Sequence, residues 1–258
     1  MDTSGNNPQL PDMSIHSPID ADVTLLIPTL GRPMLADCLR SVVEGTVWPG
    51  AIVVVDQGLQ SDIEAMMQDL AKLGIHTHYL PSNKRGRAAG LNEGLRHVNT
   101  EFVCITDDDC IVATAWIETL IQHLRQHPNR VATGQVVAGG EGVINVALAA
   151  EPFFAARPNL LHDNLSGGNF AARTSTFAEV GLFDDDPCIA YCEDGEWAYR
   201  ALRGGIEIAF IPEARVEHRD WRSLSERETQ YQNYARSQAS FYGKYLRRAD
   251  WFIACRNR

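Results

Sequence analysis

The stretch Glu101-Phe-Val-Cys-Ile-Thr-Asp-Asp-Asp109 joins a strand-forming run to a cluster of negative charge. Residues 102–106 are mostly apolar and favour extended backbone, which predicts a buried strand. Three carboxylates follow at once, at Asp107, Asp108 and Asp109. Because open α/β sheets bind ligands at the carboxyl ends of their strands, we expect functional residues at this end of the strand.

The three carboxylates need positive charge nearby, because adjacent acids raise one another's pKa. A divalent cation would supply that charge, and Mg²⁺ or Mn²⁺ would suit the cluster since both are hard ions that prefer oxygen ligands. The alternative is a solvated acidic turn in which one aspartate caps a helix that begins near Thr114. This stretch alone leaves both interpretations open.

Three apolar runs before this stretch alternate with helical patterns. We expect strands at residues 23–28, 51–56 and 76–80, with a helix after each of them. This alternation predicts a Rossmann-like, mostly parallel sheet over residues 21–130, flanked by helices on both faces. No G-x-G-x-x-G motif follows the first strand, and no G-x-x-x-x-G-K-S/T motif occurs in the chain. A metal would therefore have to bind phosphate in place of a glycine-rich loop.

Beyond residue 130 the alternation weakens. A helix is expected to begin near Tyr191, with Glu193 and Asp194 in its first turn, where the helix dipole favours negative charge. Gly204-Gly205 is expected to end this helix. The other elements that we expect are strands at 131–138, 166–173 and 206–211, a helix at 146–156, a loop or short strand at 216–218 and a long helix from residue 223.

The composition is that of an ordinary globular chain. It has 258 residues and a net charge of −10, which argues against non-specific binding to nucleic acid. The six cysteines are scattered without a zinc-binding pattern, which predicts free thiols in a reducing compartment. No secretory leader is visible, and the apolar run at residues 143–150 is far shorter than the ~20 residues of a spanning helix. We expect a cytoplasmic protein.

Several short motifs follow one another in an order found in a known family. In chain order they are Ile27-Pro28-Thr29 with Arg32, Val55-Asp56, the segment from Arg87 to Asn92, Asp107-Asp108-Asp109, Gly168-Asn169, Glu193-Asp194 with Arg200, and His218. This ordered set resembles the family-2 inverting glycosyltransferases with the GT-A fold, and the resemblance covers residues 22–220. The chain departs from the family pattern after Asp56, where Gln57-Gly58-Leu59 replaces the usual second Asp and Gly-Ser. That departure bears on nucleotide recognition.

The resemblance implies a metal-dependent, inverting transfer of a sugar from a nucleotide-diphospho-sugar (UDP, GDP or dTDP) to an acceptor hydroxyl, with Mn²⁺ or Mg²⁺ as cofactor. By similarity, Asp194 is the expected general base, with Glu193 beside it. Asp109 is the expected metal ligand, with His218 as a further candidate. The other motif residues are expected to bind substrates: Pro28, Thr29, Arg32, Asp56, Arg87, Asn92, Asp107 and Asp108 the donor, and Gly168, Asn169 and Arg200 the acceptor.

The resemblance also divides the chain. Residues 1–20 would be a disordered tail, and residues 21–220 a GT-A domain with a nucleotide-binding half (21–130) and an acceptor half (131–220). Residues 221–258 would be a basic, aromatic helical extension. From Arg215 to the end there are ten Lys and Arg against five Asp and Glu, so the charge is uneven.

The C-terminal helix has one face rich in aromatic residues, namely Tyr231, Tyr234, Gln238, Phe241 and Tyr245. With the basic residues between them, this face would suit an interfacial membrane helix in an enzyme with a lipid-linked acceptor, at the inner face of the membrane. The alternative is an amphipathic helix that packs on the catalytic domain or on a second subunit through residues 223–252. A saccharide or small-molecule acceptor remains open beside the lipid-linked one.

Two other classes of function compete with sugar transfer. Asp107-Asp-Asp-Cys-Ile111 loosely fits the D-x-D-x-T/V motif of haloacid-dehalogenase-type phosphatases, but that motif normally ends the first strand of the core, and here it ends the fourth. A non-catalytic nucleotide-sugar binder could keep the fold. Against this, the chain retains the acid pair Glu193-Asp194 that the chemistry needs.

Overall fold

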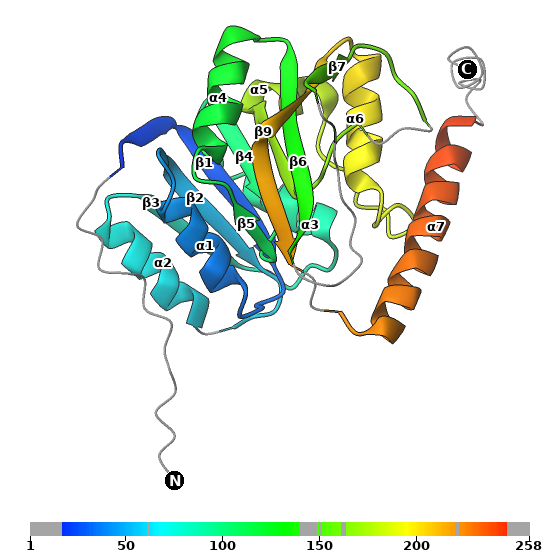
Figure 1. Ribbon diagram of the computed structural model, residues 1–258. Helices are drawn as coiled ribbons and strands as arrows, with labels where there is room; N and C mark the ends of the chain where they lie inside the picture. Colours follow the sequence, from blue (N-terminus) through cyan, green and yellow to red (C-terminus); the bar gives the residue numbers. More distant parts are fainter. Residues whose placement is uncertain are drawn as a thin grey trace.

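The computed structural model describes residues 17–60, 62–139, 149, 151–160, 164–219 and 222–246. Within these residues one nine-stranded sheet is covered by helices (Figure 1). The strands are β1 Ile19–Thr29, β2 Trp48–Asp56, β3 His76–Pro81, β4 Phe102–Thr106, β5 Cys110–Val112, β6 Arg130–Gly139, β7 Phe153–Ala155, β8 Asn169–Arg173 and β9 Glu207–Arg219. The helices are α1 Leu35–Val43, α2 Asp62–Lys72, α3 Arg87–Leu95, α4 Trp116–Gln126, α5 Thr174–Val180, α6 Glu193–Arg203 and α7 Leu224–Leu246.

The strand order is β3-β2-β1-β4-β8-β6-β9-β5, and β7 pairs with β9. The first four strands in this order are parallel, as the predicted Rossmann-like half requires. Strand β8 runs antiparallel to both β4 and β6, so the second half of the sheet is mixed. The mostly parallel α/β architecture predicted from the sequence is thus confirmed, and the place where direction changes is beside β4.

The two faces of the sheet carry separate cores, because alternate residues of a strand point to opposite sides. From β1, Leu25 and Ile27 pack with α1, α2 and α4 on one face. Leu26 packs with α3, α5 and α6 on the other. Burial on both faces explains why β1, β2 and β4 are continuous apolar runs in the sequence.

Some expected boundaries differ from the structure. Strand β1 begins at Ile19 and pairs with β2 there, so the end of the predicted tail belongs to the sheet, while residues 1–16 lie outside the described residues. The helix expected at 146–156 is wrong where the chain is described, because β7 pairs with β9 there. Residues 216–218 belong to the long strand β9, and β5 and α5 were not anticipated.

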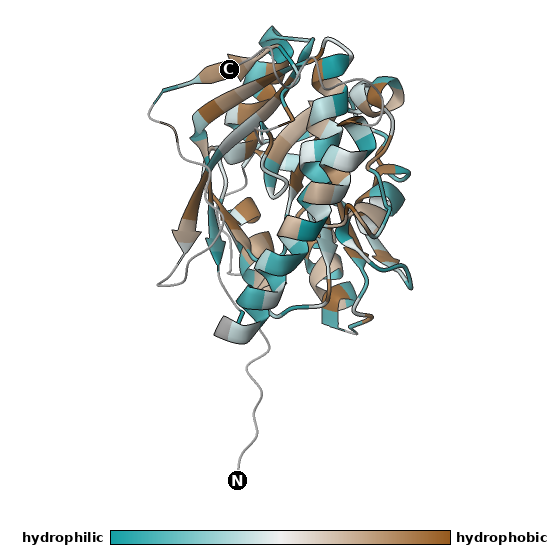
Figure 2. Ribbon diagram, turned by 90° about the vertical axis from the view of Figure 1, so that its right-hand side faces the viewer, coloured by the Kyte–Doolittle hydropathy of each residue, from teal (hydrophilic) through white to brown (hydrophobic). Residues whose placement is uncertain are grey.

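The C-terminal helix α7 is present and lies beside α6 at the edge of the domain (Figures 1 and 2). Phe241 and Tyr245 form a small buried cluster with Tyr199 of α6 and Leu160. Most of the predicted aromatic face is therefore used against the chain's own domain, although Tyr231 is 49% exposed. Residues 247–258, with the end of the predicted helix, lie outside the described residues. None of the described helices is long and apolar enough to cross a membrane.

Candidate active site

The acidic loop after β4 receives a second segment from far along the chain. Its turn is closed by the amide of Cys110, which donates to the carbonyl of Asp107. Strand β5 then runs antiparallel to β9, with Cys110 opposite His218, and the amide of Arg219 donates to the carbonyl of Asp109. The short strand β5 thereby fixes the imidazole of His218 next to the carboxylates.

Asp108 is the buried member of the triad. Its side chain accepts hydrogen bonds from Thr29 Oγ1 at 2.5 Å and from Arg32 Nη1 at 2.5 Å. Burial raises its pKa to about 6, against the opposing effects of Arg32 and Thr29. Asp108 thus ties the end of β1 to the end of β4, and both carboxylate oxygens are engaged within the protein.

The other two aspartates are placed to hold a cation. Ligand atoms of Asp107, Asp109 and Cys110 lie within 4.8 Å of one another, and His218 Nε2 lies 3.3 Å from Asp109 Oδ1. Carboxylate groups suit Mn²⁺ or Mg²⁺, and Mn²⁺ also accepts an imidazole. The Cys110 thiol does not, because burial raises its pKa and keeps it protonated. The carboxylates of Asp107 and Asp109 are therefore the donors that fit a hard divalent ion, and His218 lies beside Asp109 alone among them.

Arg87, the first residue of α3, joins this triad to the second acidic group of the site. Its Nε donates to Asp107 Oδ1 at 2.7 Å, and its Nη1 donates to Glu193 Oε1 at 3.0 Å. Its Nη2 donates to the carbonyl of Gly167 at 2.6 Å. One guanidinium therefore spans the gap between the carboxyl end of β4 and the N-terminus of α6.

The acid pair lies at the start of α6, as predicted. Asp194 accepts hydrogen bonds from the amides of Gly167 at 2.9 Å and Gly195 at 2.8 Å. Burial and the nearby charge of Asp194 raise the pKa of Glu193 to about 7, although Arg87 opposes the rise. Burial also raises the pKa of Asp194, with Arg87 and the two amides acting against it. The pair can exchange a proton near neutral pH, which is what a general base needs.

A loop of two glycines passes between the two acidic groups. A Cβ atom on Gly167 would lie 2.6 Å from Asp194 Oδ2 and 3.0 Å from Arg87 Nη1. A Cβ atom on Gly168 would lie 2.9 Å from Asp107 Oδ2. Only glycine allows the backbone to approach both groups this closely. Gly168 therefore lies where the prediction placed it, at the site, and Gly167 is a site residue that the prediction missed.

Asp56 and Gln57 both form hydrogen bonds to loops at the end of β2 and before α3. Asp56 is fully buried and accepts from the amides of Gly58, Leu59 and Gln60 and from the hydroxyl of Tyr79. Gln57 stands where the family has a second Asp, and its Nε2 donates to the carbonyls of Lys84 and Gly86. Asp56 thus has the geometry of a turn residue, and Gln57 ties the loop before α3, which carries Lys84 and Arg85, to the end of β2.

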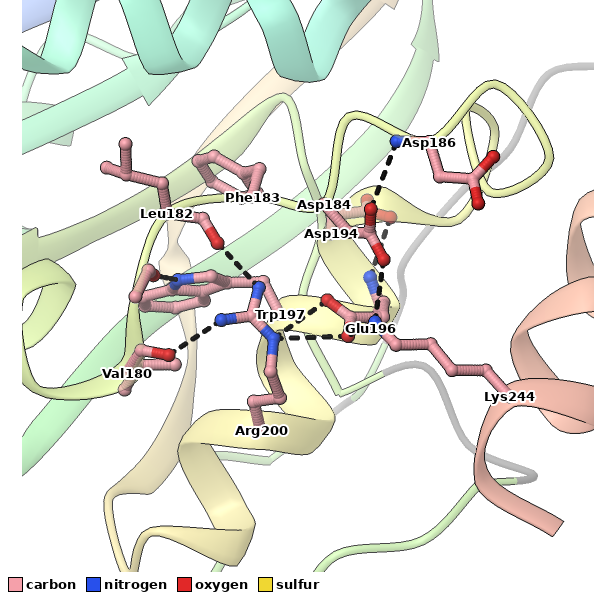
Figure 3. A network of polar contacts seen from close by, with 12 residues as sticks. Val180, Leu182, Phe183, Asp184, Asp186, Asp194, Glu196, Trp197, Arg200 and Lys244 are labelled. Atoms are coloured by element: carbon pink, nitrogen blue, oxygen red, sulfur yellow. Dashed lines mark hydrogen bonds and ion pairs between the residues drawn. The ribbon is translucent and has the colours of Figure 1, made fainter. Parts of the chain in front are cut away.

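Four other predicted substrate residues are engaged inside the protein. Asn92 pairs with both backbone groups of Phe183. Asn169, fully buried, accepts from Trp116 Nε1 and donates to the carbonyls of Gln135 and Ala214. Arg200 lies two turns along α6 and is held by Glu196 and by the carbonyls of Val180 and Leu182 (Figure 3). Pro28 is a buried residue of β1 that pairs with Val55. The geometry of these residues favours structural roles over contact with substrate.

Solved structures with a similar fold include a mannosyltransferase and a protein in complex with UDP-GlcNAc. The mannosyltransferase PcManGT from Pyrobaculum calidifontis, solved with GDP-Man and Mn²⁺, superposes with a TM-score of 0.63 at 18% identity, over 88% of this chain and 64% of that one. TarS 1–349 from S. aureus, solved with UDP-GlcNAc, superposes with a TM-score of 0.63 at 17% identity, over 78% of this chain and 59% of that one. The fold is thus the GT-A fold.

Related sequences include a glycosyltransferase and a hyaluronan synthase. A pre-mycofactocin glycosyltransferase of Mycobacterium tuberculosis is 30% identical over 220 residues, which is 79% of this chain and 45% of the relative. The hyaluronan synthase of Pasteurella multocida is 23% identical over 77% of this chain and 24% of its own length. The chain thus spans less than half the length of these relatives. The sequence profile of glycosyl transferase family 2 matches residues 24–180, more than half of the chain. The chain therefore belongs to glycosyl transferase family 2.

Proposed function

We propose that the protein transfers a sugar from a nucleotide-diphospho-sugar to an acceptor hydroxyl, with inversion and with the help of a divalent metal. One observation carries this proposal. Asp107, which with Asp109 could hold a hard cation, and Asp194, of the acid pair with raised pKa, lie against the same two-glycine loop, and Arg87 bonds to both Asp107 and Glu193. The family assignment supports the proposal and leaves the phosphatase alternative without support.

The donor diphosphate would bind at the carboxyl ends of β1 and β4. Asp107 and Asp109, with His218 beside Asp109, would hold Mn²⁺ or Mg²⁺, and such an ion would stabilise negative charge on the leaving diphosphate. Arg32 lies 3.5 Å from Asp109 and adds positive charge on the same side. The similar structures that hold GDP-Man with Mn²⁺ or UDP-GlcNAc support a nucleotide-sugar donor, with UDP, GDP and dTDP as the candidate nucleotides.

Asp194 would act as the base in a single displacement. The acceptor oxygen forms a bond to the anomeric carbon while the bond from that carbon to the diphosphate oxygen breaks. The hydroxyl proton moves to Asp194, and the electron pair of the broken bond leaves with the nucleoside diphosphate. Burial raises the pKa of Asp194 and the charge of Asp107 adds to the rise, while Glu193, held by Arg87, keeps a second carboxyl beside the base.

The acceptor hydroxyl would lie beside Gly167 and Gly168, since this loop contacts both acidic groups. A saccharide, a lipid-linked or a small-molecule acceptor fits this proposal equally. Contact of residues 223–252 with a membrane or a second subunit stays a prediction. The packing of Phe241 and Tyr245 on α6 favours the alternative in which the helix belongs to the catalytic domain.

The roles are tested by release of nucleoside diphosphate from UDP-, GDP- and dTDP-sugars in the presence of Mn²⁺. We expect Asp194→Asn to lower kcat at least a hundredfold while donor binding persists, because the amide cannot accept the proton. Lys72→Met is a suitable control, since Lys72 is an exposed residue of α2 in a surface ion pair. Wild-type kcat in Asp194→Asn would refute the assignment of the base.

A further inference from the structure

A second polar network connects helix α7 to α6, the helix that carries the proposed base. Glu196 of α6 is fully buried and lies two residues after Asp194. Its carboxylate accepts from Lys244 Nζ at 2.6 Å and from the hydroxyl of Tyr245, both on α7. Arg200 adds a third donor from α6 itself (Figure 3). A buried carboxylate with three donors is a strong anchor, because its charge has no access to water.

The same lysine also holds the segment that precedes α6. Lys244 Nζ donates to Asp184 Oδ2 at 2.6 Å. Burial alone would raise the pKa of Asp184, but the bond from Lys244 helps to bring that pKa below its ordinary value. Arg200 is bonded to the carbonyls of Val180 and Leu182 in the same segment. The four charged groups compensate one another, two acids against two bases, so the network is neutral as a whole.

Helix α7 contacts the chain on the other side of the acid pair as well. Ser237 Oγ accepts from the amide of Tyr191 at 3.3 Å, and the Cys192 thiol donates to Gln238 Oε1 at 3.4 Å. Tyr191 also packs edge-on against Tyr234, at 5.5 Å between ring centroids. Residues 191 and 192 directly precede Glu193. Helix α7 thus contacts two residues before the acid pair, Tyr191 and Cys192, and one after it, Glu196.

We propose that α7 positions the general base: by holding Tyr191, Cys192 and Glu196, it fixes the first turn of α6 and thereby the place of Asp194. The inference rests on the proposed function of Asp194. It makes Lys244 and Tyr245 positioning residues for the transfer reaction and makes residues 224–246 part of the catalytic unit. A misplacement of a catalytic group by about 1 Å can cost a hundredfold in rate. The enzyme would therefore turn over more slowly if α7 held the first turn of α6 less firmly.

The clamp itself is tested by hydrogen exchange on the full chain. In Lys244→Met and Tyr245→Phe we expect amides of residues 191–198 to exchange at least tenfold faster than in the wild type, while amides of β1 and β2 stay unchanged. Tyr245→Phe keeps the ring packed on Tyr199 and removes only the hydroxyl, so it serves if Lys244→Met does not fold. Lys72→Met is the matched control. Unchanged exchange at residues 191–198 in both variants would overturn the inference.

The consequence for catalysis is tested by Mn²⁺-supported hydrolysis of the UDP-, GDP- or dTDP-sugar that the wild type turns over fastest. We expect Lys244→Met to lower kcat about tenfold with little change in KM for the donor, and Lys244→Arg to restore most of it. Unchanged kcat in Lys244→Met would overturn the positioning role. If the wild type turns over no donor, the proposed function fails, and the exchange experiment still decides whether α7 holds α6.

Discussion

Replacement of Arg87 by methionine should destabilise the protein in a way that depends on pH. Arg87 is the cation beside the buried Glu193, and its guanidinium also binds the carbonyl of Gly167. The pKa of Glu193 is about 7 in the folded protein, against an ordinary value of 4.5. The folded protein therefore holds a proton that the unfolded chain has lost, and stability falls as the pH rises from 4.5 to 7, by about 3 kcal/mol in all.

Without Arg87 the pKa of Glu193 rises further, because the guanidinium is what lowers it. At pH 5 Glu193 is protonated with or without Arg87, so the variant should lose mainly the bonds to the Gly167 carbonyl and to Asp107, about 2 kcal/mol together. At pH 8.5 the variant must bury an unpaired carboxylate or take up a proton. Loss of one partner of a buried pair costs roughly 3–5 kcal/mol, and partial exposure of the Arg87 side chain reduces this to about 3 kcal/mol.

The assay is urea unfolding of wild type and Arg87→Met at pH 5 and pH 8.5. We expect a loss of about 2 kcal/mol at the lower pH and about 5 kcal/mol at the higher, the latter a melting-temperature decrease of roughly 10–20 °C. Arg40→Met is the control, because Arg40 pairs with Asp37 on the surface and should matter by less than about 0.5 kcal/mol at either pH. An equal loss at both pH values in Arg87→Met would refute the placement of Arg87 against Glu193.

Three further predictions concern the same site. Asn169→Ala should cost about 3 kcal/mol of stability, because Trp116 Nε1 and two buried carbonyls lose their partner. Its kcat, measured well below the melting temperature, should stay within a few-fold of the wild type. A large loss of kcat there would show that Asn169 contacts substrate. Gly167→Ala should lower kcat at least tenfold, because the added Cβ lies 2.6 Å from Asp194 Oδ2, and an active variant would show that this loop moves freely. The kcat should rise from pH 5 to pH 8, because burial raises the pKa of Asp194 and the acid pair must lose a proton to act as base; a flat profile over this range would contradict that role.

The sequence was most informative where one physical rule governs a whole element. Buried parallel strands must be apolar on both faces, so β1, β2 and β4 were visible as apolar runs, and the chemistry at their carboxyl ends followed. The second half of the sheet was harder to predict. Strand β5 has only three residues, and β8 reverses direction beside β4 through long-range pairing that leaves no local pattern.

The residues of the candidate site also differ in how well the sequence predicts their roles. The aspartates after β4 and the acid pair of α6 were expected to act together, and Arg87 connects them in the structure. Asn92 and Asn169 carry polar groups that are consumed by backbone atoms brought near by folding, and a sequence does not show which amide will be satisfied in this way. Gly167 was missed because its importance lies in the space it leaves beside Asp194.

The central claim is most directly tested by thermal stability against UDP, GDP and dTDP, each with and without Mn²⁺. Ligand bound to the folded state adds about 2.7 kcal/mol at a hundred times its dissociation constant, a rise of roughly 5–11 °C. We expect one nucleotide to give this rise only together with Mn²⁺, and Asp109→Ala to abolish it. No rise with any nucleotide, or an equal rise without metal and in Asp109→Ala, would contradict a metal-dependent donor site at the end of β4.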